Sequence, residues 1–188
     1  MRTFIAINLD QEIKRGLIQL IEELKVRSAE SRGIRWVRPE GMHLTLKFLG
    51  EIEEDKVSRI ESALRRVTEK YSPFSMKIKG TGYFPPKSKA PRVFWVGIEE
   101  EGILERIQFQ VEEEMEKLGF PKEQRKFHPH LTLGRVKTSS NLRGILDLLE
   151  KYKEKTLGEM EVKKMTFFRS VLKPTGAEYS VLSEFEFK

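Results

Sequence analysis

The tetrapeptide His-Leu-Thr-Leu occurs twice in this chain, and this repeat limits the possible folds more than any other feature. The two copies begin at His43 and His130. Polar and apolar residues alternate in each copy, which is typical of a strand buried on one face only. Because side chains two apart on a strand point to the same side, each histidine shares a face with the threonine that follows it. The leucines are therefore expected to point into a core.

The order of elements around each copy also repeats. The first copy is preceded by a predicted strand over 3–8 and by a helix that Asp10 caps and that runs to about Val26. It is followed by a predicted helix over 53–70 and a strand over 74–79. The second copy is preceded by a predicted strand over 92–98 and a helix over 102–118. It is followed by a predicted helix over 141–153 and strands over 159–168 and 178–187. A tetrapeptide at the same position in a repeated order indicates an internal duplication, with halves of about 1–90 and 91–188.

A single bilobal domain over residues 1–188 follows from the length of the chain. The strong alternation and the hairpin-like loop 85–91 favour antiparallel sheets. We therefore expect an α+β fold with two pseudo-symmetric lobes around a central cleft, each lobe an antiparallel sheet with helices on its outer face. A twofold relation between the halves would bring both histidines and both threonines to the bottom of that cleft.

Two imidazoles and two hydroxyls in one cleft suit the cleavage of a phosphodiester. The attacking water must lose a proton and the leaving sugar oxygen must gain one. Imidazole, with an ordinary pKa of about 6.5, serves both tasks at neutral pH, so His43 and His130 are candidates for acid and base. Thr45 and Thr132 are candidate donors to the phosphate oxygens of the transition state. The chemistry requires no metal or other cofactor.

Composition narrows the class of protein further. The chain has no cysteine, which excludes disulfide scaffolds, thiolate zinc sites and a cysteine nucleophile. No apolar run is long enough to cross a bilayer, and residues 1–10 do not resemble an export signal, so a cytoplasmic location without membrane contact is expected. A formal net charge of +6 suggests an anionic partner. Charged residues reach 34%, which is typical of proteins from hot environments.

The two motifs and their flanking segments resemble the two-histidine (2H) phosphoesterases, and among these the RNA 2′,3′-cyclic phosphodiesterases, also called 2′-5′ RNA ligases. The similar segments are RTFIAINL, MHLTLKFLGE, PRVFWVGI, PHLTLGRV and FFRSVLKPTGAEYSVL, at 2–9, 42–51, 91–98, 129–136 and 167–182. The resemblance implies hydrolysis of RNA 2′,3′-cyclic phosphate ends to 2′-phosphates. It implies His43 as proton donor to the departing O3′ and His130 as the base on water, although the residues alone permit the opposite assignment.

Three further residues near the motifs bear on the site. The family often has a basic residue where Arg135 stands, so Arg135 is a candidate phosphate ligand. Strand alternation puts Arg135 on the leucine face, and a bulge at Gly134 would re-aim it. Lys47 shares the parity of His43, but we expect a solvated side chain. Phe48 is expected in the core.

The sequence permits other functions as well. His128 is a third histidine, and a zinc site of three histidines would make the protein a metal-dependent phosphoesterase. A non-catalytic RNA-binding module is the second rival. Ligation of a cyclic phosphate to a 5′-hydroxyl is formally the reverse of ring opening.

The expected partner is RNA with a 2′,3′-cyclic phosphate end, such as a tRNA fragment, bound by a monomer. Four basic residues, Arg27, Arg32, Arg35 and Arg38, are able to guide such an RNA to the cleft, and a solvated loop explains them equally well.

Overall fold

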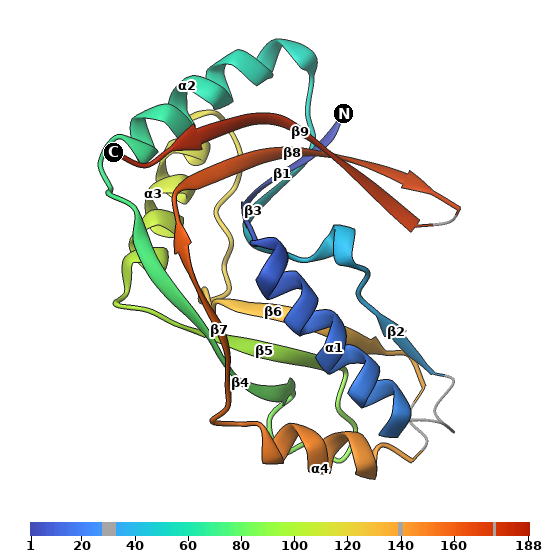
Figure 1. The fold of residues 1–188 in the computed structure, drawn as a ribbon. Helices are drawn as coiled ribbons and strands as arrows, with labels where there is room; N and C mark the ends of the chain where they lie inside the picture. Colours follow the sequence, from blue (N-terminus) through green and yellow to red (C-terminus); the bar gives the residue numbers. More distant parts are fainter. Residues whose placement is uncertain (28–32, 139–140, 175) are drawn as a thin grey trace.

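The computed structural model describes residues 1–188 except 28–32, 139–140 and 175, and contains two antiparallel sheets (Figure 1). The first sheet has the order β3 (His43–Glu51), β1 (Arg2–Asn8), β8 (Lys164–Lys173), β9 (Gly176–Glu186). The second has the order β2 (Ile34–Trp36), β6 (His130–Val136), β5 (Val93–Glu99), β4 (Phe74–Phe84), β7 (Thr156–Val162). All pairings are antiparallel, so the predicted α+β architecture is confirmed.

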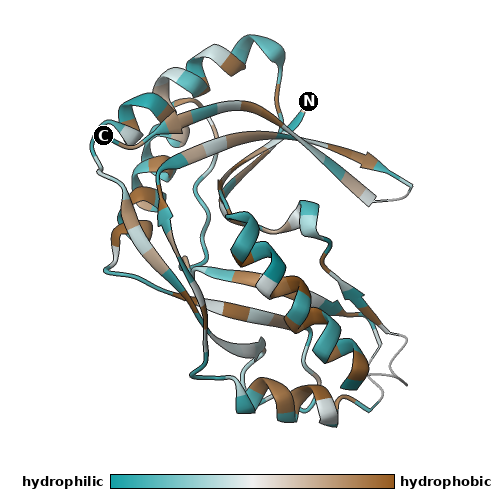
Figure 2. Cartoon of the chain, in the orientation of Figure 1, coloured by the Kyte–Doolittle hydropathy of each residue, from teal (hydrophilic) through white to brown (hydrophobic). Residues whose placement is uncertain are grey.

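Helices cover the outer face of each sheet. Helices α2 (Val57–Thr68) and α3 (Ile103–Lys117) pack with the first sheet, and α1 (Gln11–Arg27) and α4 (Arg143–Lys151) pack with the second (Figure 1). Short 3₁₀ turns precede β3 and α2, at Pro39–Gly41 (η1) and Glu54–Lys56 (η2). The helices are amphipathic, with hydrophobic and hydrophilic residues on different sides (Figure 2). No helix in the described ranges is long and apolar enough to cross a membrane.

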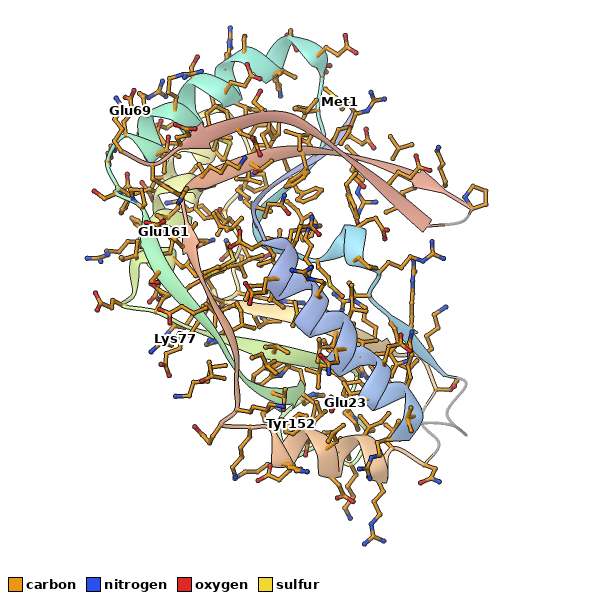
Figure 3. All side chains as sticks on the ribbon, in the orientation of Figure 1. Met1, Glu23, Glu69, Lys77, Tyr152 and Glu161 are labelled. Atoms are coloured by element: carbon orange, nitrogen blue, oxygen red, sulfur yellow. The ribbon has the colours of Figure 1, made fainter. Side chains whose placement is uncertain are left out.

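Each lobe takes elements from both halves of the sequence. Strands β2 and β4 belong to the first half but lie in the second sheet, and β8 and β9 of the second half lie in the first sheet. Helix α1 follows β1 yet contacts β7 and α4, where the Tyr152 hydroxyl donates to Glu23 Oε2 over 2.9 Å (Figure 3). The sequence halves are therefore not the lobes, and the duplication of 1–90 and 91–188 stays a prediction.

The single strand predicted over 159–168 is wrong. The structure has two strands there: β7 ends at Val162 and β8 begins at Lys164. Strand β7 pairs with β4 in the second sheet, whereas β8 pairs with β1 in the first. The chain thus changes sheets at Lys163, and alternating polarity gives no sign of it.

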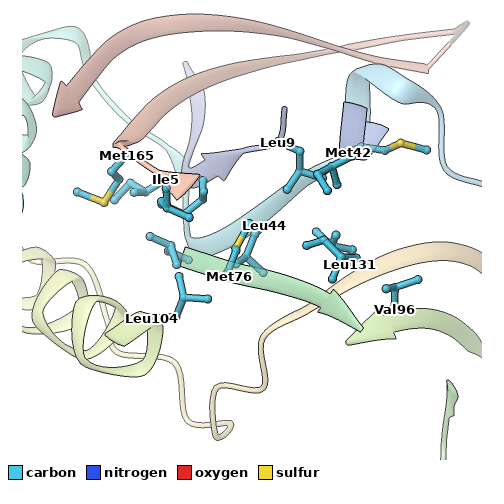
Figure 4. Packing of buried hydrophobic residues seen from close by; sticks show 14 of the residues in the cluster. Ile5, Leu9, Met42, Leu44, Met76, Val96, Leu104, Leu131 and Met165 are labelled. Atoms are coloured by element: carbon cyan, nitrogen blue, oxygen red, sulfur yellow. The ribbon is translucent and has the colours of Figure 1, made fainter. Parts of the chain in front are cut away.

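The main core lies behind the two motif strands. Leu44 and Leu131, which follow the two motif histidines, are 1% and 3% exposed. They belong to one hydrophobic cluster with Met76 of β4 and Val96 of β5 (Figure 4). Burial of these leucines turns the alternate residues of β3 and β6 outward, as the sequence predicts.

Candidate active site

The two motif strands lie side by side where the sheets meet, and a cleft of about 1850 Å³ opens between the lobes. The cleft is lined by all five residues predicted as site residues, His43, Thr45, His130, Thr132 and Arg135. The structure therefore brings both imidazoles and both threonines to one pocket. The β8–β9 hairpin forms part of the wall, through residues 172–174 and 176–179.

His43 lies in a cluster of aromatic rings on the first sheet. Its ring stacks on Phe4 and Phe168, with centroids 4.7 and 5.6 Å away, and meets the ring of Tyr179 edge-on at 5.2 Å. Within the described residues neither nitrogen of His43 has a hydrogen-bond partner, so both stay available to a ligand. Burial, and to a smaller extent the positive charge of Lys14, lowers the pKa of His43 to about 4.

This lowered pKa predicts an unusual titration of His43. In NMR titration the His43 ring is expected to protonate near pH 4 in the free protein, and Lys14→Gln is expected to raise this pKa because it removes a repelling charge. The folded pKa lies below the unfolded value of 6.5, so unfolding takes up a proton between these values. Stability present above about pH 6.5 is therefore lost as the pH falls to about 4. A His43 titration near pH 6.5 in the wild type would contradict this prediction.

The orientation of His130 is set by a backbone carbonyl. Its Nδ1 lies 2.7 Å from the carbonyl oxygen of His128. A carbonyl only accepts hydrogen bonds, so Nδ1 carries the proton and Nε2 of the neutral ring is left with a lone pair. The ring of Phe84 supports the imidazole edge-on, with centroids 5.6 Å apart. Such an imidazole is prepared to accept a proton.

Matching bulges in β3 and β6 turn two further side chains toward the cleft. Leu46 is the extra residue opposite β1, and Leu133 is the extra residue opposite β5. Beyond each bulge the faces exchange, so Arg135 lines the cleft, as the predicted bulge near Gly134 requires. At the corresponding position of β3, Phe48 is 66% exposed and also lines the cleft, so its predicted core position is wrong.

The first bulge also buries Lys47, so the predicted solvated side chain is wrong. Lys47 is 6% exposed, and its Nζ lies 2.5 Å from Glu112 Oε2 of α3. It donates a second hydrogen bond to the carbonyl oxygen of Pro121 over 2.8 Å. The backbone N–H of Glu123 donates to the same carboxylate oxygen over 3.3 Å. This pair joins β3 to the segment that leads into the second motif.

The third histidine and the basic residues predicted to guide RNA differ in their positions relative to the cleft. His128 is exposed and lines the cleft. The described ranges contain no group of three or more histidine and acidic side chains able to hold a metal ion. Arg35 and Arg38 line the cleft, and Arg27 ends α1. Arg32 lies outside the described residues.

Two antiparallel sheets that carry paired His-x-Thr strands around one cleft define a two-histidine phosphoesterase. The family model described as LigT like Phosphoesterase matches the chain twice, over residues 7–95 and 96–179. The chain belongs to this family, and the resemblance stated above is confirmed.

Relatives with known names agree with this assignment. The RNA 2′,3′-cyclic phosphodiesterase of Archaeoglobus fulgidus is 40% identical, over 99% of this chain and 100% of the relative. That of Thermotoga maritima is also 40% identical, over 100% of this chain and 96% of the relative. The crystal structure of TT0787 of Thermus thermophilus has a TM-score of 0.81 and 30% identity, and covers 100% of this chain and 98% of that chain. E. coli LigT complexed with 3′-AMP shares the fold, with a TM-score of 0.76, 22% identity and coverage of 99% and 97%.

Proposed function

We propose that this protein hydrolyses RNA 2′,3′-cyclic phosphate ends to 2′-phosphates, with His130 as the base and His43 as the proton donor. The observation that carries the proposal is that both imidazoles and both motif threonines line a single cleft. The choice of RNA as substrate is supported by the names of the relatives, which match nearly the whole chain.

The reaction needs two proton transfers on opposite sides of the phosphorus. Nε2 of His130 takes a proton from water as the water oxygen bonds to phosphorus. The bond between phosphorus and O3′ breaks, and O3′ takes the proton of the His43 imidazolium. Proton exchange with solvent then returns both rings to their starting states. Thr45 and Thr132 donate hydrogen bonds to the non-bridging oxygens, and Arg135 holds a substrate phosphate.

The lowered pKa of His43 connects its donor role to substrate binding. In the free protein, burial and Lys14 favour the neutral ring. A donor must be protonated, and an anionic phosphodiester close to the ring favours the imidazolium. His43 therefore takes up its proton together with the substrate.

A short RNA with a 2′,3′-cyclic end tests the proposal. We expect turnover to a product that ends in a 2′-phosphate, identified by comparison with 2′- and 3′-phosphate standards. The rate is expected to stay the same in EDTA, because imidazoles and hydroxyls supply every proton transfer and hydrogen bond of the step. A loss of turnover in EDTA that zinc restores would favour the metal-dependent rival. RNA binding without turnover would favour a non-catalytic module.

Ligation would use the same side chains in reverse, with a 5′-hydroxyl of RNA in place of water. A 2′-5′-linked product from a cyclic end and a 5′-hydroxyl end would demonstrate it. A tRNA fragment as substrate, a monomeric state and a cytoplasmic location stay predictions from the sequence.

A further inference from the structure

Phe48 is an exposed aromatic ring on the wall of the cleft, and the proposed acid–base step does not use it. Of the aromatic side chains in the described ranges, only Phe48 and Phe109 are exposed, at 66% and 57%, and of these two only Phe48 lines the cleft. The bulge at Leu46 turns Phe48 outward, although burial of a ring of this size would stabilise the fold. Ligand pockets are commonly lined by aromatic side chains, so this exposure indicates a surface that a ligand covers.

Phe48 lies close to the proposed proton donor. The ring of Phe4 contacts both side chains, with its centroid 4.7 Å from that of His43 and 5.8 Å from that of Phe48. The rings of His43 and Phe48 are therefore no farther apart than these two distances together. Phe4 is 2% exposed and stacks on Phe168 with centroids 5.0 Å apart. It supports Phe48 from one side, while most of the Phe48 side chain stays exposed.

The direction of the proposed reaction decides which part of the RNA reaches Phe48. Water attacks phosphorus from the side of His130, and O3′ leaves on the opposite side, toward His43. The sugar that carries O3′ therefore lies on the side of His43, and its base extends from this same sugar. Every nucleobase has a flat π face that stacks on an aromatic side chain. The base of the terminal nucleotide is thus the group that fits an exposed ring near His43.

We propose that Phe48 is the stacking platform for the nucleobase of the cyclic end. The inference rests on the proposed function and adds a base subsite to its phosphate site. Stacking makes no use of the base edge, so all four bases are accepted, and purines bind more tightly than pyrimidines because their π face is larger. The subsite selects nucleotides over other sugar cyclic phosphates.

A substrate without a base tests the platform. We compare adenosine 2′,3′-cyclic phosphate with a methyl riboside 2′,3′-cyclic phosphate, which has a methoxy group in place of the base. The wild type is expected to prefer the adenosine substrate by about tenfold in kcat/KM, the effect of one stacking contact. In Phe48→Leu this preference is expected to fall below about twofold, because leucine has no π face. In Phe48→Trp it is expected to equal or exceed that of the wild type, because indole offers a larger π face.

Two further measurements separate stacking from a change in folding or in the positions of the catalytic groups. Stacking contributes equally to the ground state and the transition state, so Phe48→Leu should raise KM for the adenosine substrate about tenfold and change kcat less than about twofold. The urea midpoint of Phe48→Leu is expected to stay that of the wild type, because the side chain is exposed. Phe109→Leu, at an exposed ring of α3 outside the cleft, is the matched control and should keep the wild-type KM and preference.

The outcomes distinguish the two proposals. Equal wild-type values for the adenosine and base-free substrates, or a loss of the same size on both in Phe48→Leu, would overturn the platform and leave the hydrolysis intact. A lower kcat with an unchanged KM in Phe48→Leu would also overturn it, since this result assigns Phe48 to the positioning of His43 through Phe4. Failure of the wild type to hydrolyse these substrates and the short RNA with a cyclic end would overturn the proposed function itself.

Discussion

Replacement of either His43 or His130 by alanine is expected to lower kcat/KM on an RNA 2′,3′-cyclic end by about 10³-fold, within the range that general acid–base catalysis contributes. Each variant removes one of the two proton transfers and leaves the threonines in the cleft. Single-turnover assays with a labelled short RNA measure the effect, because they separate chemistry from product release. His128→Ala is the matched control: the carbonyl that orients His130 is backbone, so this variant should keep near wild-type activity.

A change of leaving group assigns the two roles. A cyclic phosphate with sulfur in place of O3′ expels a thiolate, which needs little help from an acid. On this substrate His43→Ala should recover most of its activity, whereas His130→Ala should stay impaired because water still needs a base. The opposite pattern would exchange the roles. Near-wild-type activity of either variant on the ordinary substrate would contradict the acid–base pair.

The alternation of polar and apolar residues was sufficient to orient the motif side chains. Leu44 and Leu131 are buried, so His43 and His130 must face the other way. The meeting of the two strands was predictable as well, because the repeated order of elements implies a related position for each copy. Local pattern and repetition together therefore predict which residues share the cleft.

The alternation of polar and apolar residues does not predict the bulges in β3 and β6. An extra residue at Leu46 exchanges the faces of the next two residues of β3, so Lys47 turns inward and Phe48 turns outward. The bulge of β6 was open to prediction because Gly134 follows the motif, and glycine in a strand often marks such a site. In β3 the same position is Lys47, which gives no comparable signal. An exposed Phe48 on the cleft wall is thus available for stacking on a base, a feature the sequence concealed.

The sequence pattern also does not predict that each lobe contains strands from both halves of the chain. Whether a strand pairs within the first or the second sheet depends on contacts between residues far apart in the sequence. The alternation of polar and apolar residues gives no information about such contacts. The break at Lys163, where the chain passes from the second sheet to the first, is the clearest case. The core that results spans both lobes.

Replacement of the buried Lys47 is expected to lower the free energy of unfolding strongly. Lys47→Met leaves the Glu112 carboxylate buried without its cation, and breaking one partner of a buried pair costs about 3–5 kcal/mol. Urea denaturation followed by circular dichroism measures the loss. Lys79→Met is the matched control, since Lys79 pairs with Glu99 on an exposed part of the second sheet and should change the free energy of unfolding little.

The double variant Lys47→Met/Glu112→Leu separates stability from positioning. Replacing both charges by apolar side chains of similar size is often neutral, so the free energy of unfolding should return toward the wild-type value. The hydrogen bonds to the carbonyl of Pro121 and from the N–H of Glu123 are not restored, so the segment leading to His128 and His130 stays less constrained. The activity of the double variant should therefore remain about tenfold below wild type, because a small misplacement of a catalytic group is costly. If activity returns together with stability, the pair holds the fold only and does not position the second motif.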